Sequence, residues 1–93
     1  MKEDEKQFLR MIFEKCVPFG NKKCSVRDVI NNPECPVHYK RAWYVLGKWS
    51  SAKMGLYDYG VTIDLGWLTE KGIDFAKNNE TCRTNSLIQS AGH

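Results

Sequence analysis

The apolar residues near the N-terminus recur with the spacing of one helical face. Over residues 3–16 they fall at positions i, i+1, i+4, i+5 and i+8, as in an amphipathic helix. These residues are Phe8, Leu9, Ile12, Phe13 and Cys16. Acidic residues fill the first turn, where the helix dipole favours negative charge. The pattern predicts a helix over residues 3–16. The turn residues at 17–21 end this helix.

The middle of the chain predicts a short strand and two more helices. Residues 22–24 are short enough for a minor edge strand, and Ser25 is a good N-cap for a short helix over Val26–Asn31. Pro36 suits the first turn of a longer helix over residues 37–53, where its missing N–H costs nothing. The expected inner face of this helix is Ala42, Val45, Leu46, Trp49 and Ala52. The expected outer face is Val37, Lys40, Arg41, Tyr44, Gly47, Lys48 and Ser51.

The last part of the chain predicts a hairpin that leads into a helix. Residues 56–60 and 65–68 are strand-like, with the tip of the hairpin between them. Thr69 is a good N-cap for a last helix that runs to about residue 79, because its hydroxyl can accept a backbone N–H of the first turn. Gly72 lowers helix propensity there by roughly 1 kcal/mol relative to Ala. We therefore expect another backbone to approach Gly72 closely.

Length and composition predict one globular domain over residues 1–93, with its core in residues 5–80 and a C-terminal tail at 81–93. No apolar run approaches the roughly 20 residues of a membrane span. The charged N-terminus lacks the apolar region of a signal peptide. We therefore expect an intracellular protein that has no contact with a membrane.

Positive charge is concentrated in one third of the chain. Residues 22–53 carry seven bases and two acids, whereas residues 1–21 have no net charge and residues 54–93 have a net charge of −2. Such a distribution is typical of a surface that binds phosphates. An ordinary solvated face that happens to be basic gives the same count.

The four cysteines leave two interpretations open. Cys16, Cys24, Cys35 and Cys82 contain no C-x-x-C pair, so their spacing does not favour a zinc site. In most small intracellular proteins such cysteines are free and buried. In hyperthermophilic archaea they often form disulfides. We expect no metal and no other cofactor.

The order of the predicted elements, together with one short motif, resembles the winged-helix family. The motif is the run from Leu68 to Gly72, Leu-Thr-Glu-Lys-Gly, which closes the predicted hairpin, or wing. It is similar to the Leu-Thr-x-Lys-Gly run of small prokaryotic regulators of the multiple-antibiotic-resistance and phenolic-acid-decarboxylase repressor types. Size and cysteine content also resemble the minimal winged-helix proteins of crenarchaeal viruses, for which the location would be the host cytoplasm. The resemblance implies an α+β winged helix, with a three-helix core, a hairpin wing and a C-terminal dimerisation helix.

This resemblance implies sequence-specific binding of double-stranded DNA by a transcriptional regulator, with the third helix in the major groove. By position, the contacts on that helix would be Lys40, Arg41, Tyr44 and Lys48. The fork of Arg41 would read a guanine edge, and the lysines would hold phosphates. Ser25 and Arg27 would touch backbone phosphates at the start of the second helix.

The resemblance further implies a homodimer that pairs through the first and last helices. Cys82, and after it Cys16, would be the candidates for a disulfide between the two chains. Cys24 and Cys35 would be free or paired with each other. The predicted wing departs from the family, because residues 56–68 contain no base and two acids, Asp58 and Asp64. Contact between wing and DNA therefore stays open.

Two other classes of function are alternatives to DNA binding. An enzyme is not expected, since the chain shows no Ser/His/Asp order, metal cluster or phosphate-binding loop. Its only histidines are His38 and His93. The alternative is a winged-helix module that binds another protein without reading DNA, a use that the acidic wing favours.

Overall fold

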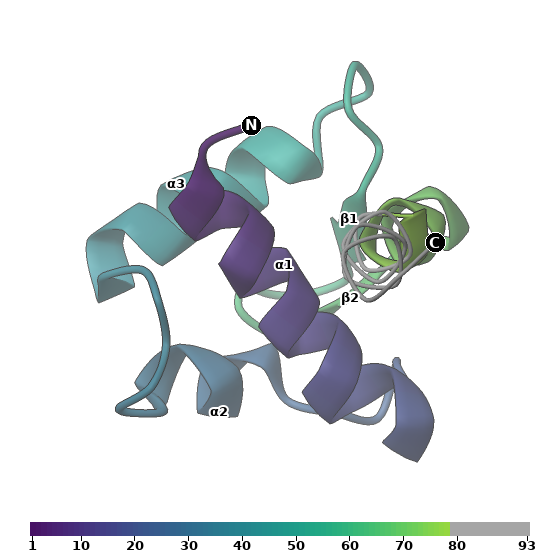
Figure 1. The fold of residues 1–93 in the computed structure, drawn as a ribbon. Helices are drawn as coiled ribbons and strands as arrows, with labels where there is room; N and C mark the ends of the chain where they lie inside the picture. The colour runs from purple at the N-terminus through teal and green to yellow at the C-terminus, as the bar shows by residue number, and fades with distance from the viewer. Residues whose placement is uncertain (79–93) are drawn as a thin grey trace, which may run out of the picture.

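The computed structural model describes residues 1–78, which form three N-terminal helices, a β-hairpin and a following helix (Figure 1). The expected C-terminal tail at 81–93 lies outside the described residues. The helices are α1 (Glu3–Cys16), the 3-10 turn η1 (Val17–Phe19), α2 (Val26–Asn31) and α3 (Tyr39–Trp49). The strands are β1 (Tyr57–Tyr59) and β2 (Gly66–Leu68), and the following helix begins at residue 70. This α+β order is consistent with a winged-helix-like topology.

The apolar faces of the helices meet in one core, as the periodicity predicted. Phe8 of α1 stacks on Trp49 of α3, with ring centroids 5.5 Å apart, and both side chains are fully buried. Ala76, from the helix that begins at residue 70, lies in the same core. Ile73 and Phe75 pack against it, which brings this last helix into contact with α1.

Helix α3 is shorter at both ends than the predicted 37–53. Val37 is buried in the core, and His38 has an extended backbone (φ −69°, ψ 155°), so the helix begins only at Tyr39. At the other end the chain leaves the helix at Ser50, and Gly55 turns it toward β1 with a positive φ of 62°. The predictions that Val37 faces outward and that Ala52 faces inward are therefore wrong, because Ala52 is exposed beyond the end of the helix.

The edge strand expected at 22–24 is a turn. Gly20 has a φ of 95°, and its carbonyl accepts hydrogen bonds from the N–H groups of Lys23 and Cys24. The side chain of Asn21 then pairs with β2 in place of a strand. Its Nδ2 donates to the Leu68 carbonyl at 2.7 Å, and its Oδ1 accepts the Leu68 N–H at 3.2 Å. One amide side chain therefore satisfies the edge of β2 at this point.

The hairpin closes around the hydroxyl group of Tyr57. The strands are antiparallel, with Tyr57 opposite Leu68 and Tyr59 opposite Gly66. The Tyr57 hydroxyl donates to the Ile63 carbonyl at 2.7 Å and accepts the Gly66 N–H at 2.8 Å. A Cβ at Gly66 would lie only 2.2 Å from the Asp58 carbonyl oxygen, so this position admits no side chain.

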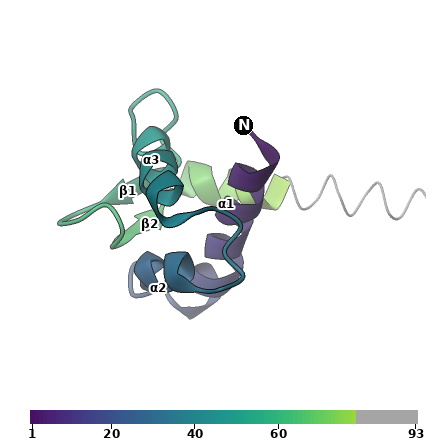
Figure 2. The ribbon, with the colours of Figure 1, turned by 90° about the vertical axis from the view of Figure 1, so that its left-hand side faces the viewer.

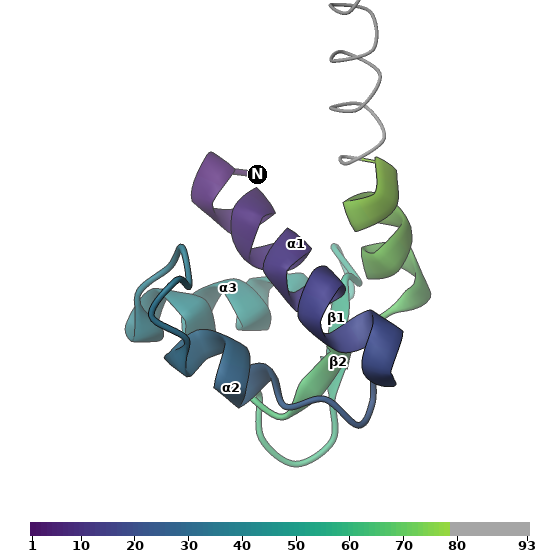
Figure 3. The ribbon, with the colours of Figure 1, turned by 60° about the horizontal axis from the view of Figure 1, so that its bottom comes forward.

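The junction between β2 and the last helix confirms the prediction made for Thr69 and Gly72. The Thr69 hydroxyl accepts the Gly72 N–H at 3.1 Å and donates to the Gly55 carbonyl. A Cβ at Gly72 would lie 2.1 Å from the carbonyl oxygen of Leu56, which is the close backbone approach that the sequence led us to expect. In Figures 2 and 3 the loop of the hairpin protrudes away from α1.

Candidate nucleic-acid interface

The outward face of α3 is the surface that the sequence proposed for DNA. Its inner face is fully buried, as predicted for Ala42, Val45, Leu46 and Trp49. Lys40 and Tyr44 lie on the opposite side and are exposed, Tyr44 by 64%. Within residues 1–78, Lys40 takes part in no ion pair. These two side chains are therefore exposed to a partner.

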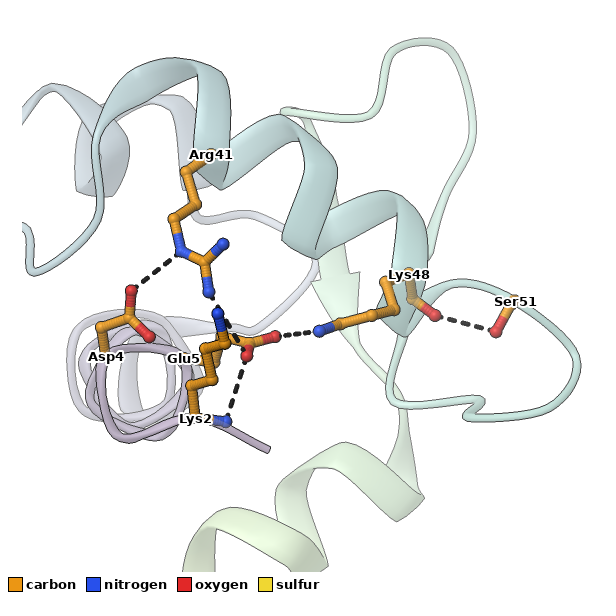
Figure 4. A network of polar contacts seen from close by, with 6 residues as sticks. All are labelled: Lys2, Asp4, Glu5, Arg41, Lys48 and Ser51. Atoms are coloured by element: carbon orange, nitrogen blue, oxygen red, sulfur yellow. Dashed lines mark hydrogen bonds and ion pairs between the residues drawn. The ribbon is translucent and has the colours of Figure 1, made fainter.

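Arg41 and Lys48 are turned toward the first turn of α1 (Figure 4). Arg41 Nε lies 2.8 Å from Asp4 Oδ2, and its Nη2 lies 3.5 Å from Glu5 Oε2. Lys48 donates to the other carboxylate oxygen of Glu5. We call these four residues the α1–α3 ion cluster. Its hydrogen-bonded partners lie 37 and 43 positions apart in sequence.

Glu5 lies at the centre of this cluster and is only 1% exposed. Burial alone would raise its pKa, but the hydrogen bonds from Lys48 and from the Lys2 N–H, with the charge of Arg41, lower the pKa below its ordinary value. The pKa of Asp4 is also lowered, chiefly by its hydrogen bond from Arg41. Both carboxylates are thus held in the charged form that keeps the two bases in place.

Sequence reasoning missed Asp4 and Glu5 as partners of α3. Their position in the first turn of a helix was explained by the helix dipole alone. A signal was present, because Glu5 precedes Phe8 and Leu9 by three and four residues and so lies on the apolar face of α1. A carboxylate on such a face needs a buried partner, and the basic helix of the chain could supply one.

The positive charge of Lys48 also lies over an aromatic ring. Its Nζ is 5.5 Å from the centroid of the Tyr44 ring, within the range of a cation–π contact. The predicted stripe of Lys40, Tyr44 and Lys48 is therefore present on α3. However, only Lys40 and Tyr44 of the three are exposed, since the side chain of Lys48 is 34% accessible.

Arg27 is used in a second internal ion pair. Its Nε lies 2.6 Å from Asp64 Oδ2, and its Nη2 lies 3.4 Å from Asp64 Oδ1. Asp64 is 3% exposed, and Arg27 lowers its pKa by hydrogen bonding. This pair ties α2 to the loop of the hairpin. Ser25 occupies the N-cap position of α2, as predicted, but its half-buried side chain makes no capping hydrogen bond.

The loop of the hairpin has an apolar surface. Because Asp64 faces inward, Asp58 is the exposed acid of the two that the sequence placed in the wing. The exposed apolar side chains are Val61 at 90%, Leu65 at 42% and Tyr59 at 39%. On the inner side of the loop Ile63 packs against Gly47, where a Cβ would lie 3.4 Å from its methyl carbon. The hairpin is therefore seated on α3 and presents an uncharged tip.

The cysteines pair differently from the expectation. Cys16, at the end of α1, forms a disulfide with Cys24 in the turn before α2, with their Cα atoms 5.1 Å apart. The sharp turn at Gly20 brings these two residues together. Cys16 is therefore bonded within the chain, not between chains, and Cys24 is not bonded to Cys35, which is a free, half-buried thiol. Cys82 lies outside the described residues.

Two further findings describe residues 1–78 as a whole. They contain no group of three His, Cys, Asp or Glu side chains placed to hold a metal ion. None of the helices in this part of the chain is both long enough and apolar enough to cross a membrane.

Comparisons with protein-family models, with curated proteins and with solved structures find no significant match to the chain.

Proposed function

We propose that this protein binds double-stranded DNA as a winged-helix regulator, with α3 in the major groove. The observation that carries the proposal is the outward face of α3, where exposed Lys40 and Tyr44 lie on a helix with the hairpin packed beside it. A helix of this kind fits the major groove of B-DNA, and the adjacent hairpin would reach the neighbouring backbone or minor groove. No ion pair within residues 1–78 competes with a phosphate for Lys40.

The other proposed contacts differ in how readily they would reach DNA. Lys48 and Arg41 are each about one-third exposed, at 34% and 32%, and both are bound to carboxylates of α1. Arg27 is 51% exposed beside Asp64, so its guanidinium can approach a phosphate without leaving its partner. Ser25 would add a hydroxyl at the start of α2. In this proposal Lys40 supplies the strongest phosphate contact.

We further propose a homodimer that pairs through α1 and the last helix. In Figure 2 the hairpin and α1 lie on opposite sides of the fold, so pairing through α1 would leave the hairpin free. Phe13, Ile73 and Phe75 lie on these two helices and are only partly buried. A two-fold dimer would bind a pseudo-palindromic site, with one α3 in each half.

The salt dependence of DNA binding tests the proposal. In fluorescence polarisation with a labelled duplex, affinity should fall linearly with salt concentration on a double-logarithmic plot between about 50 and 200 mM, because phosphate contacts release counterions. Lys40→Ala should weaken binding to all duplexes and reduce the slope by about 0.9 per binding site. The matched control is Lys77→Ala, which removes the same charge from an exposed position on the last helix. Equal effects of both substitutions would contradict a role for α3.

One observation favours a second function, a module that binds another protein. The tip of the hairpin exposes Val61, Leu65 and Tyr59 and carries no basic residue. An uncharged apolar tip suits a protein surface better than a phosphate backbone. This function takes precedence if the wild-type protein shows no salt-dependent affinity for any duplex.

A further inference from the structure

The exposed part of α3 offers few side chains that read guanine or adenine with two hydrogen bonds. Its most exposed large apolar residues are Tyr44 at 64% and Tyr39 at 52%, with Lys40 between them. Bidentate contacts to base edges come from Arg or Lys for guanine and from Asn or Gln for adenine. Helix α3 contains no Asn or Gln, its one arginine is Arg41, and the proposed function already assigns Lys40 to a phosphate.

The fork of Arg41 is already occupied. Asp4 lies 2.8 Å from its Nε, and Glu5 lies 3.5 Å from its Nη2. If Arg41 turned to a guanine, it would leave two carboxylates with fewer partners, and one of them, Glu5, is 1% exposed. Leaving a buried charge with weaker pairing is unfavourable. This cost favours a position of Arg41 on α1 over the role of guanine reader that the sequence suggested for it.

We propose that the ring of Tyr44 recognises thymine through its C5-methyl group, so that the protein prefers sites with thymines at the position facing this ring. The proposal rests on the proposed function and deepens it. Among the bases, only thymine presents a methyl group in the major groove, and apolar side-chain atoms make the contact that detects it. Tyr44 is the most exposed aromatic residue of α3, and Lys48 lies against its ring, 5.5 Å from the centroid.

The neighbouring residues give this reading a defined geometry. Lys40 lies one helical turn before Tyr44 on the same face, where its ammonium would hold a phosphate and fix the helix in the groove. Tyr39 packs against Trp43, with ring centroids 6.2 Å apart, and is less exposed than Tyr44. Tyr44 is thus the specificity-determining residue, and Lys40 is a positioning residue.

The test uses a duplex selected by the full-length protein from a random pool. Each thymine of that duplex is replaced in turn by uracil, which keeps the base pair and removes only the methyl group. The wild-type protein should bind about fourfold more weakly for each contacted methyl group lost. Replacing guanines by 7-deazaguanine, which removes the N7 acceptor, should leave affinity unchanged at the bases facing α3.

Variants assign the effect to Tyr44. Tyr44→Ala should bind the thymine and uracil duplexes equally, and Tyr44→Phe should keep the difference, since the ring and not the hydroxyl makes the contact. Tyr59→Ala, which removes an exposed tyrosine from the hairpin, is the matched control and should also keep the difference.

The outcomes separate this inference from the function on which it rests. If the wild-type protein binds the thymine and uracil duplexes equally, recognition of the methyl group is overturned while salt-dependent DNA binding still stands. If it loses affinity with 7-deazaguanine at a base facing α3, a residue of that helix contacts guanine, and the assignment of Lys40 to a phosphate alone is overturned. If Tyr44→Ala keeps the difference, another residue reads the methyl group and the assignment to Tyr44 is overturned. A pool that yields no preferred duplex overturns recognition of the methyl group, and the proposed DNA binding falls with it only if no duplex shows salt-dependent affinity.

Discussion

Glu5 and Asp64 are the two buried charged side chains of the described residues, and they make a useful comparison. Glu5 lies on α1 and holds two bases of α3, whereas Asp64 lies in the loop of the hairpin and holds one base of α2. All three bases were candidates for DNA contact by sequence. Within the fold, the two buried carboxylates bind bases that the sequence had assigned to the DNA-binding surface.

The two sites differ in depth. Glu5 accepts hydrogen bonds from Lys48 and the Lys2 N–H and is 3.5 Å from the Arg41 guanidinium, while the basic side chains around it are about one-third exposed. Among the basic residues of the described chain, only Arg27 forms an ion pair with Asp64, and the side chain of Arg27 is 51% exposed. Water competes more strongly for a base that is half exposed. We therefore expect the joint between α1 and α3 to contribute more to stability than the joint between α2 and the hairpin.

The largest expected effect is on stability, and it tests this ranking directly. Glu5→Gln should lower the free energy of unfolding by about 2 kcal/mol, and Asp64→Asn by about 1 kcal/mol, as expected for hydrogen bonds to charged groups of different exposure. Urea unfolding followed by tryptophan fluorescence measures both. Glu3→Gln, at an exposed position in the same turn of α1, is the control and should change little. A larger loss for Asp64→Asn than for Glu5→Gln would reverse the comparison.

The same comparison explains how far the sequence could be interpreted. Local patterns predicted the hairpin and the observed bounds of α1 and α2, because the periodicity of each depends on neighbours in sequence. A glycine in a helical turn also predicted the close approach at Gly72, although the sequence did not show that Leu56 makes it. The pairs Asp4–Arg41 and Arg27–Asp64 each join residues 37 positions apart. A count of charges cannot show which of them meet. Three of the seven bases in residues 22–53 form such pairs, so the count overstated the basic surface.

The expected edge strand failed for a related reason. Residues 22–24 are compatible with a strand, but the φ of 95° at Gly20 starts a turn there, and the amide of Asn21 bonds to Leu68 instead. Whether β2 pairs with a strand or with the side chain of Asn21 depends on residues distant in sequence, since Asn21 and Leu68 are 47 positions apart. Tertiary contacts of this kind override local propensity.

A smaller effect is expected in the dependence of stability on pH. The folded-state pKa values of Glu5 and Asp64 are lowered below their ordinary values of 4.5 and 3.8. A lowered pKa adds stability that is complete above the unfolded-state pKa and is lost as pH falls through the folded-state pKa. The free energy of unfolding should therefore fall below about pH 4.5, and the difference between wild type and Glu5→Gln should narrow there. Urea midpoints at pH 7, 5, 4 and 3 measure it. A difference that stayed constant with pH would show that Glu5 acts through packing and not through charge.

The smallest expected effect separates the exposed member of the α1–α3 ion cluster from the buried one. The side chain of Asp4 is 37% exposed, so Asp4→Asn should leave the urea midpoint unchanged. It should loosen the hold on Arg41, because the uncharged amide oxygen accepts a weaker hydrogen bond from its Nε, while the longer contact to Glu5 remains. In the proposed complex the freed guanidinium gains a phosphate, so the slope of affinity against salt should steepen by about 0.9 per binding site. Fluorescence polarisation with the duplex used for Lys40→Ala measures the slope.

The control for this prediction is again Glu3→Gln, which removes one negative charge from the same turn without breaking an ion pair given by the structure. If only the overall charge of α1 mattered, both substitutions would raise affinity alike, and Arg41 would have no particular role. If Asp4→Asn alone steepens the slope, Asp4 withholds Arg41 from the DNA. Because Glu5 still holds Lys48 in that variant, the change in slope reports only how far the exposed carboxylate of Asp4 limits the positive charge that α3 presents to DNA.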